Sequence, residues 1–126
     1  MILLFGALLG LISVLFGAFA EHGLKGSITD EQFRLLTIAL RYNQVHAVMG
    51  ALIGLSSFKS KKMIRWSGCL FIIGTVLFSF SIYLAVWLDI PRLLQITPIG
   101  GVLMMAAWLF LLLFGVKTAF KGQGHE

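Results

Sequence analysis

The chain has 126 residues, a length typical of one domain, but its composition excludes a water-soluble domain. Apolar residues make up 59% of the sequence, charged residues make up 12%, and the mean hydropathy is +0.97. The formal charge of +5 does not indicate nucleic-acid binding, because the lysines and arginines cluster at the ends of apolar segments, where membrane topology accounts for them. We therefore expect an all-α integral membrane protein.

Four apolar stretches are long enough to cross a hydrocarbon layer of about 30 Å as helices. They cover residues 1–20, 41–58, 65–88 and 96–116, within a single four-span membrane domain over residues 1–126. The lipid bilayer is thus the first partner that the sequence predicts.

The first apolar stretch has a competing interpretation as an export signal. Ala18-Phe19-Ala20 has the small-x-small form of a cleavage site. No basic residue precedes the apolar run, however, and an export signal does not need a stripe of small residues for helix packing. We therefore expect the first stretch to be retained as a membrane helix.

Small residues line one face of each of the first two predicted spans. They recur every three or four residues, which places them on one side of a helix and lets another helix approach closely. The two stripes are Gly6, Gly10, Ser13 and Gly17 in the first span, and Ala47, Gly50, Gly54 and Ser57 in the second. We expect the stripes to pack against each other or against a second copy of the chain.

The residues before the second span also have a helical pattern. Thr29 followed by Gln32 predicts a capping box, and Asp30 and Glu31 suit the N-terminus of a helix. Polar side chains up to Arg41 share one face, which is typical of a short interfacial helix leading into the second span. The sequence leaves open whether this helix is separate from the span or continuous with it.

Turn signals set the other boundaries of the predicted spans. Residues 89–92 (Asp-Ile-Pro-Arg) predict a turn, and Thr97-Pro98 predicts an N-cap residue followed by a proline in the first helical position.

The basic residues are distributed unequally between the two sides of the membrane. Those on one side are Lys59, Lys61, Lys62, Arg65, Lys117 and Lys121, and those on the other side are Lys25, Arg34, Arg41 and Arg92. This excess places the 59–62 loop and both termini in the cytoplasm.

Polar groups within a membrane are costly and are the first candidates for function. No Asp, Glu, Lys or Arg lies near the middle of a predicted span, and His46 is the most deeply placed ionisable side chain. A candidate polar cluster near the outer interface consists of Glu21, His22, Tyr42, Asn43 and His46. We expect it to be a set of interhelical hydrogen bonds that fixes packing, with His46 close to His22 or Thr97.

Four motifs occur in chain order: GAFAEHGLK, RYNQVHA, VLFSFSIYLA and TPIGGVLMMAAWLFL. Together they resemble the YgdD-like family of small four-helix bacterial inner-membrane proteins, also called domain of unknown function 423. The resemblance places the family's marked residues on His22, Gly23, Tyr42, His46, Ser79, Ser81, Tyr83, Thr97, Pro98, Gly100, Gly101 and Trp108, with departures at Glu21, Asn43, Phe80 and Ala107. It implies four spans, a retained first helix and a bacterial plasma-membrane location, and it supplies no activity.

These features favour a non-enzymatic accessory or stabilising component that acts through helix contacts, within a homo-oligomer or a larger membrane complex. Four short helices leave little room for both a substrate cavity and a gate. One alternative is a homodimeric small transporter or channel, although the first span carries no embedded glutamate. Another is a haem- or metal-binding subunit with His22 and His46 as ligands, although no haem-attachment or paired-histidine motif accompanies them, so we expect no cofactor and no metal.

Overall fold

The computed structural model describes residues 1–125, which form four helical rods joined by short turns. The first two rods are α1 (Ile2–Phe19), extended by one π-helical turn (Ala20–Leu24), and α2 (Asp30–Leu55). The third rod, here called the α3–α4 rod, runs through α3 (Lys62–Thr75), a π-helical turn (Val76–Phe80) and α4 (Ser81–Trp87). A 3-10 turn (Pro91–Gln95) leads into α5 (Thr97–Lys121), which a second 3-10 turn (Gly122–His125) follows. The predicted all-helical class is confirmed.

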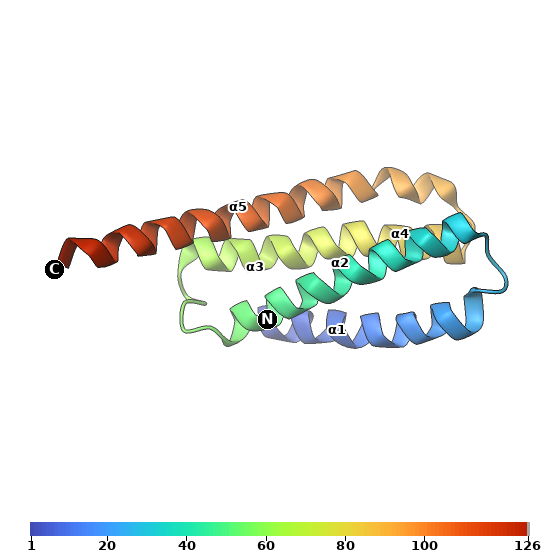
Figure 1. Cartoon of the computed structure of the whole chain (residues 1–126), viewed down its shortest axis with the longest axis horizontal. Coiled ribbons are helices and arrows are strands. Elements are labelled where there is room, and N and C mark those ends of the chain that lie inside the picture. Colours follow the sequence, from blue (N-terminus) through green and yellow to red (C-terminus); the bar gives the residue numbers. More distant parts are fainter. Residues whose placement is uncertain (126) are drawn as a thin grey trace.

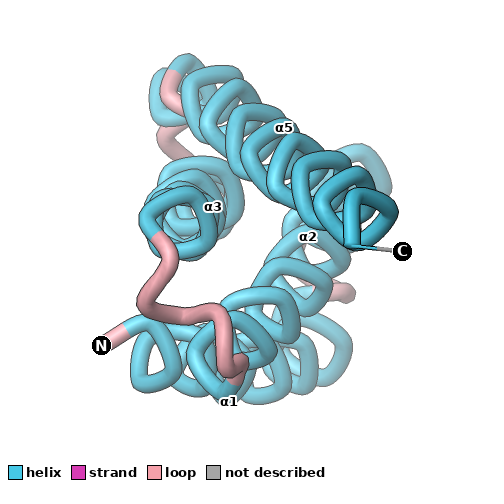
Figure 2. Tube along the Cα trace, turned by 90° about the vertical axis from the view of Figure 1, so that its left-hand side faces the viewer, coloured by secondary structure: helices cyan, strands magenta, loops and turns pink. Residues whose placement is uncertain are grey.

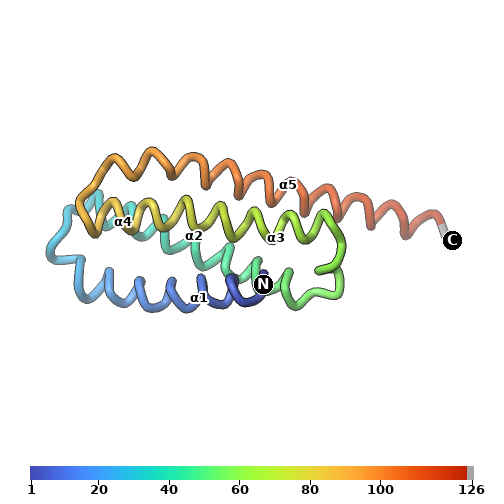
Figure 3. The backbone as a smooth tube through the Cα atoms, turned by 180° about the vertical axis from the view of Figure 1, so that it is seen from behind, coloured from blue at the N-terminus to red at the C-terminus, as the bar shows by residue number. Residues whose placement is uncertain are grey.

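The rods form an elongated bundle with the connecting turns at its two ends (Figure 1). Viewed along the bundle, α1 and α5 lie on opposite sides, with α2 and α3 between them (Figure 2). The N-terminus and the 56–61 turn lie at one end, here called the loop end, and α5 extends past this end (Figure 3). The turns over residues 25–29 and 88–96 lie at the opposite end.

Three of the four rods are long and apolar enough to cross a membrane. The corresponding segments are Ile2–Leu24, Lys62–Trp87 and Pro91–Gly124. They contain most or all of the predicted spans 1–20, 65–88 and 96–116. The predicted span 41–58 falls mainly in α2. This helix is not among the three segments that are apolar enough, because its first half is polar.

α2 is one unbroken helix, so the interfacial helix predicted before Arg41 does not exist as a separate element. The predicted capping box is confirmed: the Thr29 hydroxyl accepts from the Gln32 N–H at 3.1 Å, and the Gln32 side chain accepts from the Thr29 N–H at 3.0 Å. Leu36 and Ala39 are fully buried in a cluster with α1 and α4 residues. This burial holds the first half of α2 in the bundle and explains its continuity.

α1 and α2 are antiparallel and meet through the predicted small-residue stripes. A Cβ atom added at Gly54 would lie 2.6 Å from the backbone nitrogen of Leu3, and one at Gly6 would lie 2.7 Å from that of Ala51. Only glycine permits this approach. Gly6 and Gly10 of the first stripe therefore meet Gly50 and Ala47 of the second. Gly17 packs against Leu40 instead, and Ser57 lies beyond the end of α2.

A second tight crossing joins the α3–α4 rod to α5. A Cβ atom at Gly74 would lie 2.9 Å from the carbonyl oxygen of Gly100, and one at Gly100 would overlap the backbone of Phe78. The π-helical turn of the rod, Val76–Phe80, lies at this crossing. The bundle is thus built from two close helix pairs, α1 with α2 and α3 with α5.

The turn after α4 confirms one predicted boundary and corrects another. Asp89 has a φ of 54°, the left-handed conformation that ends a helix, and the Ile90 N–H donates to the Ala85 carbonyl at 2.9 Å. α5 begins at Thr97, but its N-cap is Ile96. The prediction that Thr97 caps the helix is wrong, because its hydroxyl shares a 2.6 Å hydrogen bond with Ser81 instead.

The glycine contacts predict different outcomes for two alanine substitutions in α1. Gly6→Ala should lower the free energy of unfolding by about 1–3 kcal/mol, because the new methyl group meets the backbone of α2. Gly10→Ala is the matched control, since its Cβ would lie 3.8 Å from that of Ala47, an ordinary contact. Unfolding in mixed micelles, followed by circular dichroism, measures both. Equal effects of the two substitutions would contradict the close packing.

Candidate functional site

The bundle interior holds polar side chains that join different rods by hydrogen bonds; we call them the interior polar set. Its interhelical bonds are Asn43–Tyr83 (3.0 Å), His46–Trp108 (3.1 Å), Ser67 to the Ala107 carbonyl (2.8 Å), Ser79 to the Ala39 carbonyl (2.8 Å) and Ser81–Thr97 (2.6 Å). Hydrocarbon offers no hydrogen-bond partners, so polar groups within a membrane bundle must satisfy one another. The set therefore links α2, the α3–α4 rod and α5.

His46 uses both ring nitrogens. Its Nδ1 lies 2.7 Å from the backbone carbonyl oxygen of Tyr42, one turn earlier in α2, and Trp108 of α5 donates its indole N–H to Nε2 at 3.1 Å. An indole nitrogen can only donate, so Nε2 accepts and the ring hydrogen is on Nδ1, which donates to Tyr42. The two bonds define one tautomer of a buried imidazole.

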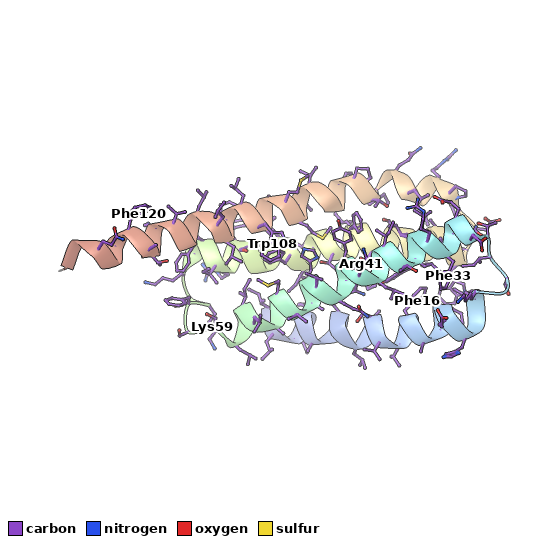
Figure 4. All side chains as sticks on the ribbon, in the orientation of Figure 1. Phe16, Phe33, Arg41, Lys59, Trp108 and Phe120 are labelled. Carbon is purple, nitrogen blue, oxygen red and sulfur yellow. The ribbon has the colours of Figure 1, made fainter. Side chains whose placement is uncertain are left out.

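Aromatic rings enclose this histidine. The Phe71 ring centroid lies 5.3 Å from that of His46 and 5.0 Å from that of Trp108, and Phe71 is fully buried. The Tyr42 ring lies parallel to the imidazole at 5.9 Å. Trp108 reaches from α5 to this group, beside α2 and α3 (Figure 4). The histidine is therefore held in a packed aromatic environment.

Asn43 is the least satisfied member of the interior polar set. Its Nδ2 donates to the Tyr83 hydroxyl, whereas its Oδ1 is buried without a hydrogen-bond partner among residues 1–125. A buried acceptor without a partner costs about 1–3 kcal/mol. The Tyr83 ring stacks on Phe16 of α1 at 4.3 Å, so the pair also connects α2 and α4 to α1.

The structure brings together only part of the predicted polar cluster. Asn43 and His46 lie in the interior, and Tyr42 is 42% exposed but contributes its carbonyl and its ring. Glu21 and His22 are exposed at the end of α1, where Glu21 pairs with Lys25 at 3.0 Å. The predicted convergence of all five residues does not occur.

The register of α1 against α2 explains this separation. Gly10 faces Ala47, so His22 lies about 16 Å from the level of His46 along the helix axes. The prediction that His46 lies near His22 or Thr97 is therefore wrong, and its partner is Trp108. The two histidines do not form a shared ligand pair, and residues 1–125 contain no group of three His, Cys, Asp or Glu side chains placed to hold a metal ion.

Several residues that the family resemblance marks take part in the contacts between rods. Ser79, Ser81, Tyr83, Thr97 and Trp108 all belong to the interior polar set, as His46 does. Of the marked glycines and proline, Gly100 lies in the close crossing with Phe78, Gly101 has ordinary contact with that side chain, Gly23 lies against Phe19, and Pro98 follows the first residue of α5. The marked residues thus make hydrogen bonds between rods and, at Gly100, a close backbone contact.

The sequence interpretation did not single out Ser67 and Thr75. Ser67 donates to α5, and Thr75 donates to its own helix at the Phe71 carbonyl, 2.6 Å away. Their spacing carries a signal, because Ser67, Gly74 and Thr75 stand at positions i, i+7 and i+8, which share one side of a helix over the predicted third span. A polar and small-residue stripe on this span indicates its inward face.

These observations define a small helical membrane protein whose interior is held by polar bonds. The chain belongs to the family described as "Protein of unknown function (DUF423)", which matches residues 16–101. It is 36% identical over 115 residues to the UPF0382 membrane protein SH2409 of Staphylococcus haemolyticus, covering 91% of this chain and 94% of that protein. It is 31% identical over 127 residues to the UPF0382 inner membrane protein YgdD of Escherichia coli, covering 98% and 95% respectively. No solved structure shows significant similarity.

The bond between His46 and Trp108 predicts an energetic coupling between α2 and α5. In a double-mutant cycle with His46→Leu and Trp108→Phe, we expect a coupling energy of about 0.6–2 kcal/mol, because each single change removes one partner of this bond between the buried His46 and the partly exposed Trp108. Unfolding in mixed micelles measures it.

The control for this cycle is Trp66→Phe, since Trp66 is 53% exposed and makes no side-chain hydrogen bond within the described part of the chain. It should show no coupling to His46→Leu. A coupling as large as that of Trp108 would rule out a specific bond.

Proposed function

We propose that all four rods cross the bilayer, as one multi-pass domain over residues 1–126. The support is the packing of α2 along α1: Gly54 lies against Leu3 near one end, and Leu36 shares a buried cluster with Ala20 near the other. A helix that lies beside a membrane-crossing helix over this length occupies the same depth. α2 is about 39 Å long, enough to cross a hydrocarbon layer of about 30 Å.

The charged residues of α2 are compatible with this depth. Arg41 is exposed and lies at the level of Phe16, about 4.5 Å inside the end of α1 and about 12 Å inside the end of its π-helical extension, so its long side chain can reach the interface. Arg34 lies further out and pairs with Glu31 at 2.6 Å. Both side chains of this pair are exposed.

The distribution of basic residues supports an orientation. Six lysines and arginines lie at the loop end or on the emerging part of α5: Lys59, Lys61, Lys62, Arg65, Lys117 and Lys121. The loop end therefore carries more basic residues than the opposite end. This difference favours a cytoplasmic location for the loop end and for both termini. A relative whose name describes an inner membrane protein favours the bacterial plasma membrane.

We infer further that the chain acts through helix contacts on its outer faces, as a non-enzymatic accessory or stabilising component of a homo-oligomer or a larger membrane complex. The observation that carries this proposal is the bonded and packed interior. Asn43, His46 and Tyr83 are buried and hydrogen-bonded between rods, and they do not line the α1–α3 groove described below. Their hydrogen bonds to other rods support a role in stabilising the bundle.

The seam between α1 and α3 is the best candidate for such a contact. It forms a groove of about 400 Å³ with almost entirely apolar walls, which include Phe5, Cys69, Ile72 and Ile73. The small-residue stripes of α1 and α2 are already used within the chain, so this open seam remains for a ridge of side chains from another helix.

Photo-crosslinking in native membranes tests this function. A benzophenone side chain introduced at Ile73, which is 51% exposed in the seam, should give a protein adduct of one discrete mass. Leu109, which is 55% exposed on α5 and does not line the seam, is the matched control and should crosslink mainly to lipid. Lipid adducts alone from both positions would refute the accessory role, and a dimer-sized adduct would identify a second copy as the partner.

A further inference from the structure

A groove at the loop end combines positive charge with apolar walls. It has a volume of about 310 Å³ and lies between the start of α3 and the last turns of α5. Its lining includes Lys61, Lys62, Lys117 and Lys121, with Phe58 and Phe114 as aromatic walls. The two phenylalanine rings meet edge to face, with centroids 5.6 Å apart.

No acidic side chain in the described part of the chain balances these lysines. The acidic residues between positions 1 and 125 are Glu21, Asp30, Glu31 and Asp89, and all four lie toward the opposite end of the bundle. The salt bridges among residues 1–125 involve Lys25 and Arg34, so none of the four groove lysines is paired there. Four lysines in one groove create a positive potential that attracts anions.

The first turn of α3 adds hydrogen-bond donors to the same place. α3 begins at Lys62, and its N-cap, Lys61, makes no side-chain capping bond. The first backbone N–H groups of a helix have no partner within the helix and lie at the positive end of its dipole, an arrangement suited to phosphate. The start of α3, which lines the groove with Lys61 and Lys62, thus adds to the positive potential at this place.

A second groove continues from the first along the α3 and α5 surface. It has a volume of about 500 Å³ and apolar walls that include Trp66, Leu70 and Phe110, and it shares Lys62 and Met63 with the lysine-lined groove. Trp66 is 53% exposed near the start of α3, where an indole suits the boundary between headgroups and hydrocarbon. A charged groove that opens into an apolar one matches a molecule with an anionic head and a hydrocarbon tail.

We propose that these two grooves bind one anionic phospholipid. Its phosphate lies among Lys61, Lys62, Lys117 and Lys121 at the start of α3, and an acyl chain lies along Trp66 and Leu70. The apolar continuation distinguishes this ligand from a free phosphate ion, which would use only the lysine-lined groove. This inference does not depend on the accessory role proposed above.

Native mass spectrometry of the full-length protein in neutral detergent tests the proposal, with dioleoyl phosphatidylglycerol and dioleoyl phosphatidylcholine as competing probes. We expect the wild-type protein to prefer phosphatidylglycerol by at least about tenfold, since basic residues near an anionic lipid each add to the attraction. A variant with Lys61, Lys62, Lys117 and Lys121 changed to glutamine should lose this preference. The four lysines are exposed, so helix content by circular dichroism should be unchanged.

The matched control changes Lys25, Arg34, Arg41 and Arg92 to glutamine, which removes the same charge away from the grooves. It should retain the preference for phosphatidylglycerol. Equal loss in both variants, or retention in the lysine variant, would overturn the proposal. Displacement of the lipid by an equal concentration of soluble glycerol phosphate would also overturn it, because the site would then bind free anions without using the apolar groove.

Discussion

The absence of water in hydrocarbon is the constraint on which this bundle depends. α2 carries the polar residues that are hardest to place there, Asn43 and His46, and both bond to side chains of other rods. α2 also receives a hydrogen bond from Ser79 at the carbonyl oxygen of Ala39. The buried polar residues of α2 therefore fix its position against the other rods, whereas the charged residues of its first half are exposed.

Two kinds of contact hold the four rods together. Glycines bring the helices together in pairs, α1 with α2 around Gly6 and Gly54, and α3 with α5 around Gly74 and Gly100. Hydrogen bonds then join the two pairs, because His46 reaches α5 and Asn43 reaches α4. Dispersion forces act at the close backbone contacts, and directional bonds set the register between pairs. A bundle held in this way has its polar groups inside and offers its apolar outer faces for contacts with other molecules.

Local signals in the sequence predicted the local structure. The capping box at Thr29, the turn at Asp89 and the facing stripes of Gly6 and Gly54 follow from neighbouring residues and helical spacing. The sequence did not predict the hydrogen-bond partners of the polar residues. These partners lie far away in the sequence, and they depend on how the two helix pairs are rotated against each other. Thr97 is an example. Its position before Pro98 suited an N-cap, but its hydroxyl forms a hydrogen bond with Ser81 of α4 instead.

The central claim is that α2 crosses the membrane although it is polar over its first half. Labelling with a membrane-impermeant maleimide tests it most directly, with Ser27→Cys or Ser60→Cys introduced into a Cys69→Ala background. Both serines are exposed, and α2 is the only rod between them. If α2 crosses the membrane, Ser27→Cys reacts from outside in intact cells and Ser60→Cys reacts only after permeabilisation. Labelling of both positions from the same side would show that α2 does not cross.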